Sequence, residues 1–483
     1  MKILLSLLFC IPFILLAQTE QDTTSVNQKY SMLYKKRVLE NIEIDLLGSF
    51  YTQDGSNAAV TGGVGTEELK DLASNLNISI PLNDDDVLTI DATISAYSSA
   101  SSSNLNPFLG TEYDDDDERR IGTITGGTPW VASSGASKED VWKSGVLGFS
   151  HSSDDRNKIY TTNLSFAKEY DYTSFGVGLG FTKLFNQKNT ELGISANVYF
   201  DTWQPEYPIE LKNYMNTIGK LNTGIFSGID ILNASGNPID KNSLTVWKPF
   251  NNKLIDDEKR NTYSLSLSFS QILSKNLQVS IFADFVIQQG WLANPMQRVY
   301  FSDVDNFYIG NAANIINYTN PINTDVFQLA DDIERLPDSR SKVPIGMRFN
   351  YFISENFVLN TYYRYYFDDW GINSHTLNIE VPIKISETLT LYPTYRFYNQ
   401  TASNYFAPFE QNLSTEKYYT SDYDLSKFNS NQFGFGIKYT DIFTQNHLWL
   451  LGLKNVSLNY NYYKRNSGLE AHIISLGVKF IIE

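Results

Sequence analysis

Charged side chains recur at alternate positions of several segments whose intervening positions are apolar. In "LTIDATIS", for example, Asp91 lies between Ile90 and Ala92. Because successive side chains of a β-strand point to opposite faces, such charges share one face of each segment. A charged face of this kind attracts or repels dissolved ions. The acidic positions are Glu43, Asp45, Asp91, Asp284 and Glu380, and the basic positions are Arg348, Arg364, Lys384, Arg396, Lys438 and Lys479.

Most of the acidic positions come early in the chain and most of the basic positions come late. If these strands enclose a pore, an acidic wall faces a basic wall, and the field between them selects solutes by charge and dipole. The alternative is that the charges form ion pairs that brace or fill the interior. A lumen packed with tyrosines would favour this alternative, and the candidates are Tyr362, Tyr366, Tyr392 and Tyr398.

The sequence offers little material for catalysis. It has 4 His and one Cys, Cys10. Ser374 and His375 are adjacent in a predicted strand and therefore point to opposite faces, so they cannot form a dyad. We expect neither an enzyme nor a cofactor. The carboxylates of Asp114, Asp115, Asp116 and Asp117 are a weak candidate for a calcium site, against the alternative of a solvated acidic loop.

Period-two alternation predicts an all-β chain of antiparallel strands. Short polar breaks, such as 83–86 and 274–276, alternate with long polar connections, such as 204–260 and 291–342. This asymmetry is typical of a transmembrane up-and-down β-barrel with short periplasmic turns and long extracellular loops. Counting segments predicts about 16 strands, with lipid outside and a polar lumen inside.

The first residues predict export from the cytoplasm. Lys2 precedes an apolar run that is too short to span a bilayer, and Ala17 offers a cleavage edge. The predicted organisation is a signal peptide at 1–17, a short periplasmic arm at 18–37 and the outer-membrane barrel at 38–483. Tryptophans near the predicted strand ends are expected at the membrane interface, since the indole ring is apolar with one polar group. These are Trp203, Trp291, Trp370 and Trp449.

The net charge of −16 argues against nucleic acid as a partner, because phosphate binding requires a basic surface. The expected partners are outer-membrane lipid and, as an open possibility, another protein of the envelope; no oligomeric state follows from the sequence.

Two early segments carry a family resemblance. They are "LLGSFYTQDGSNAAVTGGVGTEELKD" and "ISIPLNDDDVLTIDATISAYSSASSSN", and the similarity is most specific between Asp54 and Asn104. The chain resembles an uncharacterised Gram-negative outer-membrane family, domain of unknown function 3570. No functional residues can be transferred from this family. Its members often lie beside genes for a small lipoprotein, a thioredoxin-like protein and a flavin transferase, which implies an envelope redox context.

Two functions fit these patterns. The first is a porin-like channel or solute-transport barrel with oppositely charged lumen walls, for which about 16 strands enclose enough space. The second is a non-conducting scaffold or a subunit of an envelope complex for redox chemistry or export. In that case the long loops would plug the lumen or form a docking surface.

Overall fold

A computed structural model describes residues 37–99, 105–106, 111–113, 119–121, 139–205, 207–249, 255–320 and 325–482. The chain divides into two units, Met1–Lys36 and Arg37–Glu483, and the structure described below belongs to the second unit. The predicted signal peptide, nearly all of the predicted arm and Asp114–Asp117 lie outside the described residues.

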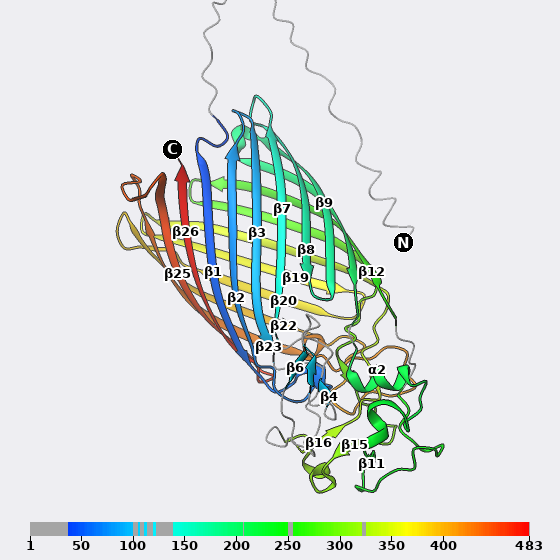
Figure 1. Cartoon of the computed structure of the whole chain (residues 1–483). Coiled ribbons are helices and arrows are strands. Elements are labelled where there is room, and N and C mark those ends of the chain that lie inside the picture. Colours follow the sequence, from blue (N-terminus) through cyan, green and yellow to red (C-terminus); the bar gives the residue numbers. More distant parts are fainter. Residues whose placement is uncertain are drawn as a thin grey trace, which may run out of the picture. The chain divides into compact units, whose positions relative to one another are not determined.

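Sixteen antiparallel strands form a closed barrel, which confirms the predicted fold and strand number (Figure 1). Each strand pairs with its neighbours in the chain, and the first pairs with the last from Ile42–Ile482 to Asp54–Glu470. The strands are β1 (Ile42–Asp54), β2 (Leu69–Pro81), β3 (Asp86–Ser99), β7 (Glu139–Ser152), β8 (Lys158–Glu169), β9 (Tyr172–Phe185), β10 (Thr190–Trp203), β12 (Glu258–Ser274), β13 (Leu277–Gly290), β18 (Ser339–Ser354), β19 (Phe357–Asp368), β20 (Asn373–Glu380) continued by β21 (Ile383–Lys384), β22 (Leu389–Gln400), β23 (Phe428–Thr440), β25 (Leu451–Arg465) and β26 (Glu470–Ile482).

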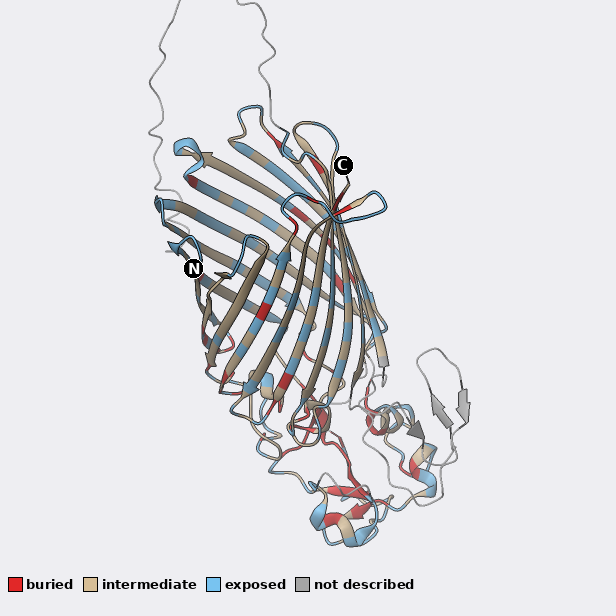
Figure 2. Cartoon of the chain, turned by 90° about the vertical axis from the view of Figure 1, so that its left-hand side faces the viewer, coloured by how far each residue is buried: buried red, intermediate tan, exposed pale blue. Residues whose placement is uncertain are grey.

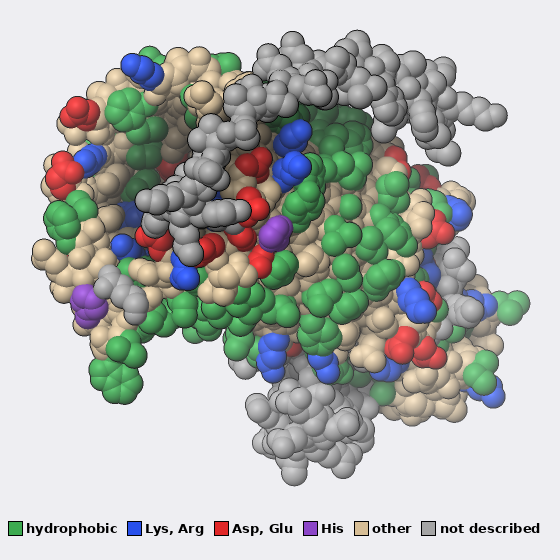
Figure 3. All heavy atoms as spheres, turned by 90° about the horizontal axis from the view of Figure 1, so that it is seen from above, with side chains coloured by type: hydrophobic (Ala, Val, Ile, Leu, Met, Phe, Trp, Pro, Cys, Tyr) green, Lys and Arg blue, Asp and Glu red, His purple; other side chains and the backbone are tan. Residues whose placement is uncertain are grey.

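The outer wall of the barrel is apolar. On β12, Leu265 and Leu267 face outward and are 39% and 41% exposed, while Ser266 between them faces the lumen. Figure 3 shows hydrophobic side chains on the outer wall and acidic and basic side chains within the hollow. An apolar exterior around a polar interior is the arrangement that a lipid bilayer stabilises. Among the described residues, no helix is long and apolar enough to cross a membrane.

The two ends of the barrel differ. At the turn end the strands are joined by short turns such as 153–157 and 275–276, and the C-terminus lies at the same end (Figure 1). At the loop end, long connections alternate with three tight ones at 170–171, 369–372 and 466–469. The barrel therefore has one rim made of mostly short turns and one rim made of mostly long loops.

Four long connections at the loop end fold together into a body that we call the loop cap. It comprises the described residues of 55–68, 204–257, 291–338 and 401–427. Figure 2 shows that buried residues gather in these loops rather than in the barrel wall. The ordered elements of the cap include η1 (Ala59–Thr61), α2 (Ile209–Asn216), β11 (Leu232–Asn233), β14 (Arg298–Val299), β15 (Phe307–Gly310), β16 (Val326–Gln328) and β17 (Asp332–Ile333).

The cap has a hydrophobic core of its own. Its main cluster joins residues of 204–257, such as Phe226 and Trp247, to residues of 291–338, such as Leu329. The indole of Trp247 donates to the carbonyl oxygen of Ala330 at 3.0 Å, so burial leaves no unpaired donor on that ring. A second cluster, which includes Phe301 and Tyr419, joins 291–338 to 401–427. The connections that the sequence analysis treats as polar loops therefore form a packed structure.

One buried ion pair ties three of these loops together. The side chains of Arg298 and Glu210 are both 0% exposed, and Arg298 Nε lies 2.5 Å from Glu210 Oε1. A second guanidinium nitrogen of Arg298 donates to the carbonyl oxygen of Val60 at 2.7 Å. Removing one partner of such a pair leaves a buried charge without compensation, which destabilises more than the intact pair stabilises.

Arg298→Met is expected to destabilise the cap by about 3–5 kcal/mol, because Glu210 then remains buried and unpaired. The measurement is limited proteolysis of the detergent-purified chain, with the barrel monitored by its heat-dependent mobility in gels. Adding Glu210→Leu to Arg298→Met should restore most of the protease resistance. Lys220→Met, at an exposed position of the same cap, is the control. Equal cleavage of Arg298→Met and the parent chain would contradict this role of the ion pair.

Buried carboxylates make the stability of the cap depend on pH. Burial raises the pKa of Asp331 to about 7 and that of Glu334 to about 8, and it raises the pKa of Asp422 to about 6. Glu410, Asp332 and Asp303 add to the rise at Asp331, while the amide of Phe301 donates to its carboxylate at 2.9 Å and opposes the rise. Below pH 6 all three groups are protonated to a large extent in the folded cap.

Because these folded-state pKa values are raised, the cap binds more protons than its unfolded form above about pH 4. The contribution of these three groups to the stability of the cap is therefore greatest below that pH and falls from there as the pH rises through the folded values of about 6, about 7 and about 8. Amide hydrogen exchange in the cap, followed from pH 5 to pH 8.5, should show progressive loss of protection after correction for intrinsic rates. Asp331→Asn should flatten part of this dependence, whereas the exposed Asp257→Asn should leave it unchanged. A dependence as steep in Asp331→Asn as in the parent chain would exclude Asp331 as a source.

Candidate functional site

Barrel closure places one predicted basic residue beside predicted acidic ones. Lys479 on β26 lies next to β1, where its Nζ is 2.7 Å from Glu43 Oε2 and 3.3 Å from Asp45 Oδ2. The sequence pattern predicts these groups on opposite walls, but the pairing of the first and last strands makes them neighbours. This part of the lumen therefore contains the ion pairs of the alternative interpretation.

Asp91 occupies a different position relative to the basic residues. It lies on β3, the third strand of the ring, while Arg364 lies on β19, the eleventh. Eight strand-to-strand steps separate them in a ring of 16, which is half of the circumference. The carboxylate of Asp91 accepts hydrogen bonds from Asn75 at 3.0 Å and from Asn77 at 3.1 Å. Amide donors hold this charge on its own wall without neutralising it.

Near the loop end, inward charges that the sequence analysis omits are paired. Arg260 lies 3.1 Å from Asp201, and Arg340 lies 2.5 Å from Asp368. Arg465 lies 2.8 Å from Asp424 in the loop cap. All of these residues except Asp424, which lies in the cap, follow the same alternation as the predicted ones, so the strand pattern was the signal that could have identified them. Pairing reduces the field that these residues contribute at the rim.

Deeper in the lumen, three arginines line one cavity of about 840 Å³. Arg348, Arg364 and Arg396 come from β18, β19 and β22, and each occupies an inward position of its strand. Within the described part of the chain none of the three makes an ion pair or a hydrogen bond through its side chain. Glu380 also lines the cavity, where it accepts a hydrogen bond from Asn360 at 3.0 Å. Three guanidinium groups against one carboxylate make the cavity electropositive.

An aromatic pair covers the wall beside these arginines. The rings of Phe282 on β13 and Tyr362 on β19 are stacked, with centroids 5.6 Å apart and planes 7° apart. Gly346 on the intervening strand β18 makes this possible, since a Cβ at that position would lie 2.2 Å from the Phe282 ring. The guanidinium of Arg348 lies 5.9 Å from the centre of the Tyr362 ring. We call Phe282 and Tyr362 the aromatic shelf; sequence alternation predicts their face but not their stacking.

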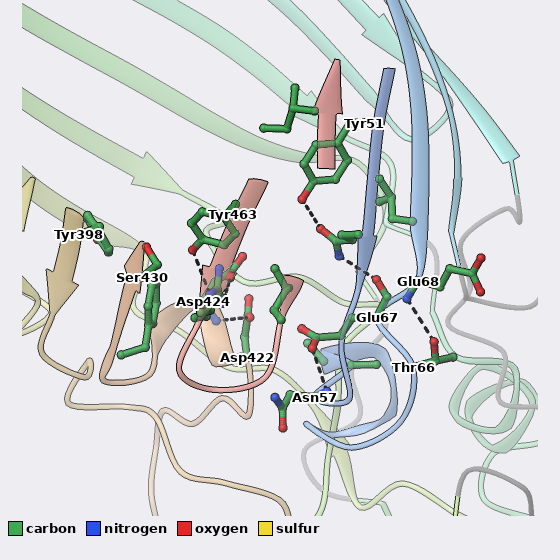
Figure 4. A pocket seen from close by; sticks show the side chains of 18 of the residues that line it. Tyr51, Asn57, Thr66, Glu67, Glu68, Tyr398, Asp422, Asp424, Ser430 and Tyr463 are labelled. Carbon is green, nitrogen blue, oxygen red and sulfur yellow. Dashed lines mark hydrogen bonds and ion pairs between the residues drawn. The ribbon is translucent and has the colours of Figure 1, made fainter. Parts of the chain in front are cut away.

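Shared lining residues connect this cavity to two others. Arg396 also lines a cavity of about 740 Å³ at the loop end, and Glu380 also lines one of about 450 Å³ that includes Lys438. Figure 4 shows the loop-end cavity, where barrel residues such as Tyr463 face cap residues such as Asp422. The three cavities therefore follow one side of the lumen from the cap into the barrel.

The remaining predicted lumen residues have simpler positions. Lys384 lies near the turn end, with its Nζ 2.8 Å from Glu387 and 38% of its side chain exposed. Asp284 occupies an inward position of β13 opposite Ser266 on β12. Tyr362, Tyr392 and Tyr398 each line one of the cavities, and they leave space in the lumen rather than filling it.

The structure places three of the four predicted interface tryptophans elsewhere. Trp203 points to the same inward face of β10 as Asp201, and the centre of its ring lies 5.9 Å from Cζ of Arg260. Trp291 packs against the core of the cap, and Trp370 is 3% exposed with its ring over Arg340. All three stand where strands enter or leave the cap, so packing there outweighs a position in the interface. Trp449, in the 441–450 connection at the turn end, is 97% exposed.

Three of the four histidines have a side-chain partner, and His151 Nδ1 lies 2.6 Å from Asp86 Oδ1 near the turn end. On the outer wall, His375 hydrogen-bonds the Tyr363 hydroxyl at 2.7 Å, and His472 does the same with Tyr460 at 2.8 Å. Ser374 points to the opposite face from His375, as its alternation requires. Within the described ranges no group of His, Cys, Asp and Glu is arranged to hold a metal ion.

Gly346→Ala tests the packing of the aromatic shelf. The added Cβ would meet the Phe282 ring, so we expect that ring to leave its stack and the barrel to lose about 1–3 kcal/mol. The urea midpoint of the chain reconstituted in lipid vesicles is the measurement. Gly48→Ala is the matched control, since a Cβ there meets no atom within 4 Å. Equal midpoints for the two variants would argue against close packing at Gly346.

Comparison with solved structures returns outer-membrane proteins at low similarity. A bacterial polysaccharide outer membrane secretin shares 9% identity over 92% of this chain and 99% of that chain, with a TM-score of 0.40. A mutant of the TodX monoaromatic hydrocarbon channel shares 9% identity over 92% of this chain and 91% of that chain, with a TM-score of 0.40. A BenF-like porin from Pseudomonas fluorescens Pf-5 shares 8% identity over 92% of this chain and 100% of that chain, with a TM-score of 0.37. The curated proteins contain no match.

The sequence itself supplies a more direct comparison. The family model described as "Protein of unknown function (DUF3570)" matches residues 14–476, which is most of the chain. This match confirms the resemblance in the early strands. The chain therefore belongs to the DUF3570 family of proteins of unknown function.

Proposed function

We propose that this protein is a channel of the outer membrane that passes small solutes and favours anions. The observation that carries the proposal is the set of connected cavities along the arginine side of the lumen. A closed barrel that was filled by its own side chains would not contain cavities of about 740 and 840 Å³ lined by charged groups. Lipid is the partner of the outer wall.

The charges along this route support selection by sign. Arg348, Arg364 and Arg396 lack neutralising partners in the described structure, while Arg260, Arg340 and Arg465 near the loop end each pair with an aspartate. Low-dielectric walls concentrate the field of an unpaired charge inside a narrow space. Asp91 on the opposite side adds to the potential difference across the lumen, so an anion is drawn toward the arginine wall.

The loop cap determines how a solute enters. Its residues Asn57, Glu67 and Gln297 line the loop-end cavity together with barrel residues. The carboxylate of Glu67 is held by the Asn57 amide at 3.0 Å, and the Gln53 side chain donates to the Glu67 carbonyl oxygen at 2.8 Å (Figure 4). Solutes therefore pass beside a structured part of the cap on their way to the arginines.

A second candidate function is that of a non-conducting scaffold that binds an envelope protein. The folded cap favours it, because a packed body with exposed apolar side chains offers a surface for a partner. Ile218, Leu244 and Ile316 are 86%, 88% and 87% exposed on the cap. These side chains are isolated from one another in sequence, so the cavities of the lumen support the channel more directly.

Single-channel recording in planar bilayers tests the proposed function. In a potassium chloride gradient the parent protein should conduct, and its reversal potential should have the sign of chloride selectivity. Replacing Arg348, Arg364 and Arg396 together by Gln should shift the reversal potential toward cation selectivity. Lys70→Gln changes an outward lysine of β2 and should leave the reversal potential unchanged.

The outcomes separate the two functions. Absence of conductance from a correctly folded barrel, at any salt concentration, would overturn the channel and favour the scaffold. Conductance with an unchanged reversal potential in the triple variant would retain the channel but exclude the arginine wall as its selective element.

A further inference from the structure

The arginine cavity contains polar groups that lack partners. Arg364 Nε and Thr376 Oγ1 are both inaccessible to solvent and have no hydrogen-bond partner. Both residues line the same cavity as Arg348 and Arg396. A buried donor without a partner costs free energy, and a bound acceptor would recover it. These two atoms are covered by the barrel wall, so the donors that a ligand would meet are the other nitrogens of the three lining guanidinium groups.

The aromatic shelf lies on the wall of this same cavity. The ring planes of Phe282 and Tyr362 are nearly parallel, and the Phe282 ring lies over Gly346, where it occupies the space that a Cβ would take. Aromatic faces gain most from contact with another flat, apolar group, while a guanidinium plane pairs with the two oxygens of a carboxylate. The two features together match a molecule that has a flat body and a carboxylate at one edge.

We propose that the cavity bounded by Arg348, Arg364, Arg396, Phe282 and Tyr362 is a binding site for small organic carboxylates with a flat, unsaturated body. This inference rests on the proposed channel function, to which it adds the class of solute. The carboxylate contacts the arginines, and the flat body lies along the aromatic shelf.

The charge of the cavity argues for a monocarboxylate over a more highly charged anion. Glu380 lines the cavity and holds a negative charge beside the three arginines. A second or third negative charge on the ligand would approach this carboxylate and lose part of what it gains from the arginines. Inorganic anions would contact the guanidinium groups but would gain nothing from the shelf.

Isothermal titration of the detergent-purified full-length protein at low salt tests the site. The probes are benzoate, cyclohexanecarboxylate, acetate and benzyl alcohol, which separate the carboxylate from the flat body. Benzoate should bind about tenfold more tightly than cyclohexanecarboxylate and acetate. Benzyl alcohol, which has the ring without the charge, should give no measurable binding up to about 10 mM.

Two variants divide the site into its parts. Arg364→Gln should weaken benzoate and cyclohexanecarboxylate alike, by about tenfold, because both lose a contact to the carboxylate. Tyr362→Leu should weaken benzoate alone and so remove its advantage over cyclohexanecarboxylate. Lys70→Gln, on the outer wall, should bind all four probes as the parent protein does. Gel mobility with and without heating shows that each variant is folded.

The site and the channel fail in different ways. Normal conductance in potassium chloride together with no benzoate binding would overturn the site and leave the channel in place. Benzoate binding without conductance would overturn the channel and retain a carboxylate site in a closed barrel. Equal affinity for benzoate and cyclohexanecarboxylate in the parent protein would overturn the role of the aromatic shelf.

Discussion

The structure depends on the pairing of every backbone amide in a wall that has no water on its outer side. An unpaired peptide group in lipid costs several kcal/mol, so a sheet in a membrane cannot have an edge. The ladder between β1 and β26 removes the two edges that a chain of 16 strands would otherwise present. Closure also determines which lumen charges meet, and it is the reason that Lys479 lies between Glu43 and Asp45 and offsets part of their negative charge.

Pairing and its absence divide the lumen into regions with different properties. At the loop end, ion pairs such as Arg340–Asp368 join neighbouring strands and weaken the field of the charges that they contain. In the middle, Arg348, Arg364 and Arg396 are unpaired in the described structure and line an open cavity. This division follows from strand geometry. Alternation decides which face of the sheet a side chain takes, and the register between strands decides which side chains lie beside it. The candidate functional region is therefore the part of the lumen where alternation turns a charged side chain inward and the strand register places no opposite charge beside it.

Much of the barrel could be predicted from sequence because a strand has a period of two. The inward faces of Asp91 and Arg364 and the number of strands follow from that period and from turn spacing. The stacking of Phe282 on Tyr362 could not be predicted, since it requires the register of three strands and the space above Gly346. Nor could the cap, whose core brings Phe226 to Leu329 across about a hundred residues. Trp370 was placed wrongly for the same reason: its partner Arg340 lies on a neighbouring strand.

The construction of the cap has a consequence for the order of biogenesis. Its core and the contacts of Arg298 draw on loops that lie early, midway and late in the chain. Because these contacts join different loops, the complete cap cannot form until those loops have been brought to one end of the cylinder. Formation of the cap is thus a late event that only a correctly assembled molecule completes. Protease resistance of the cap would act as a natural signature of successful insertion.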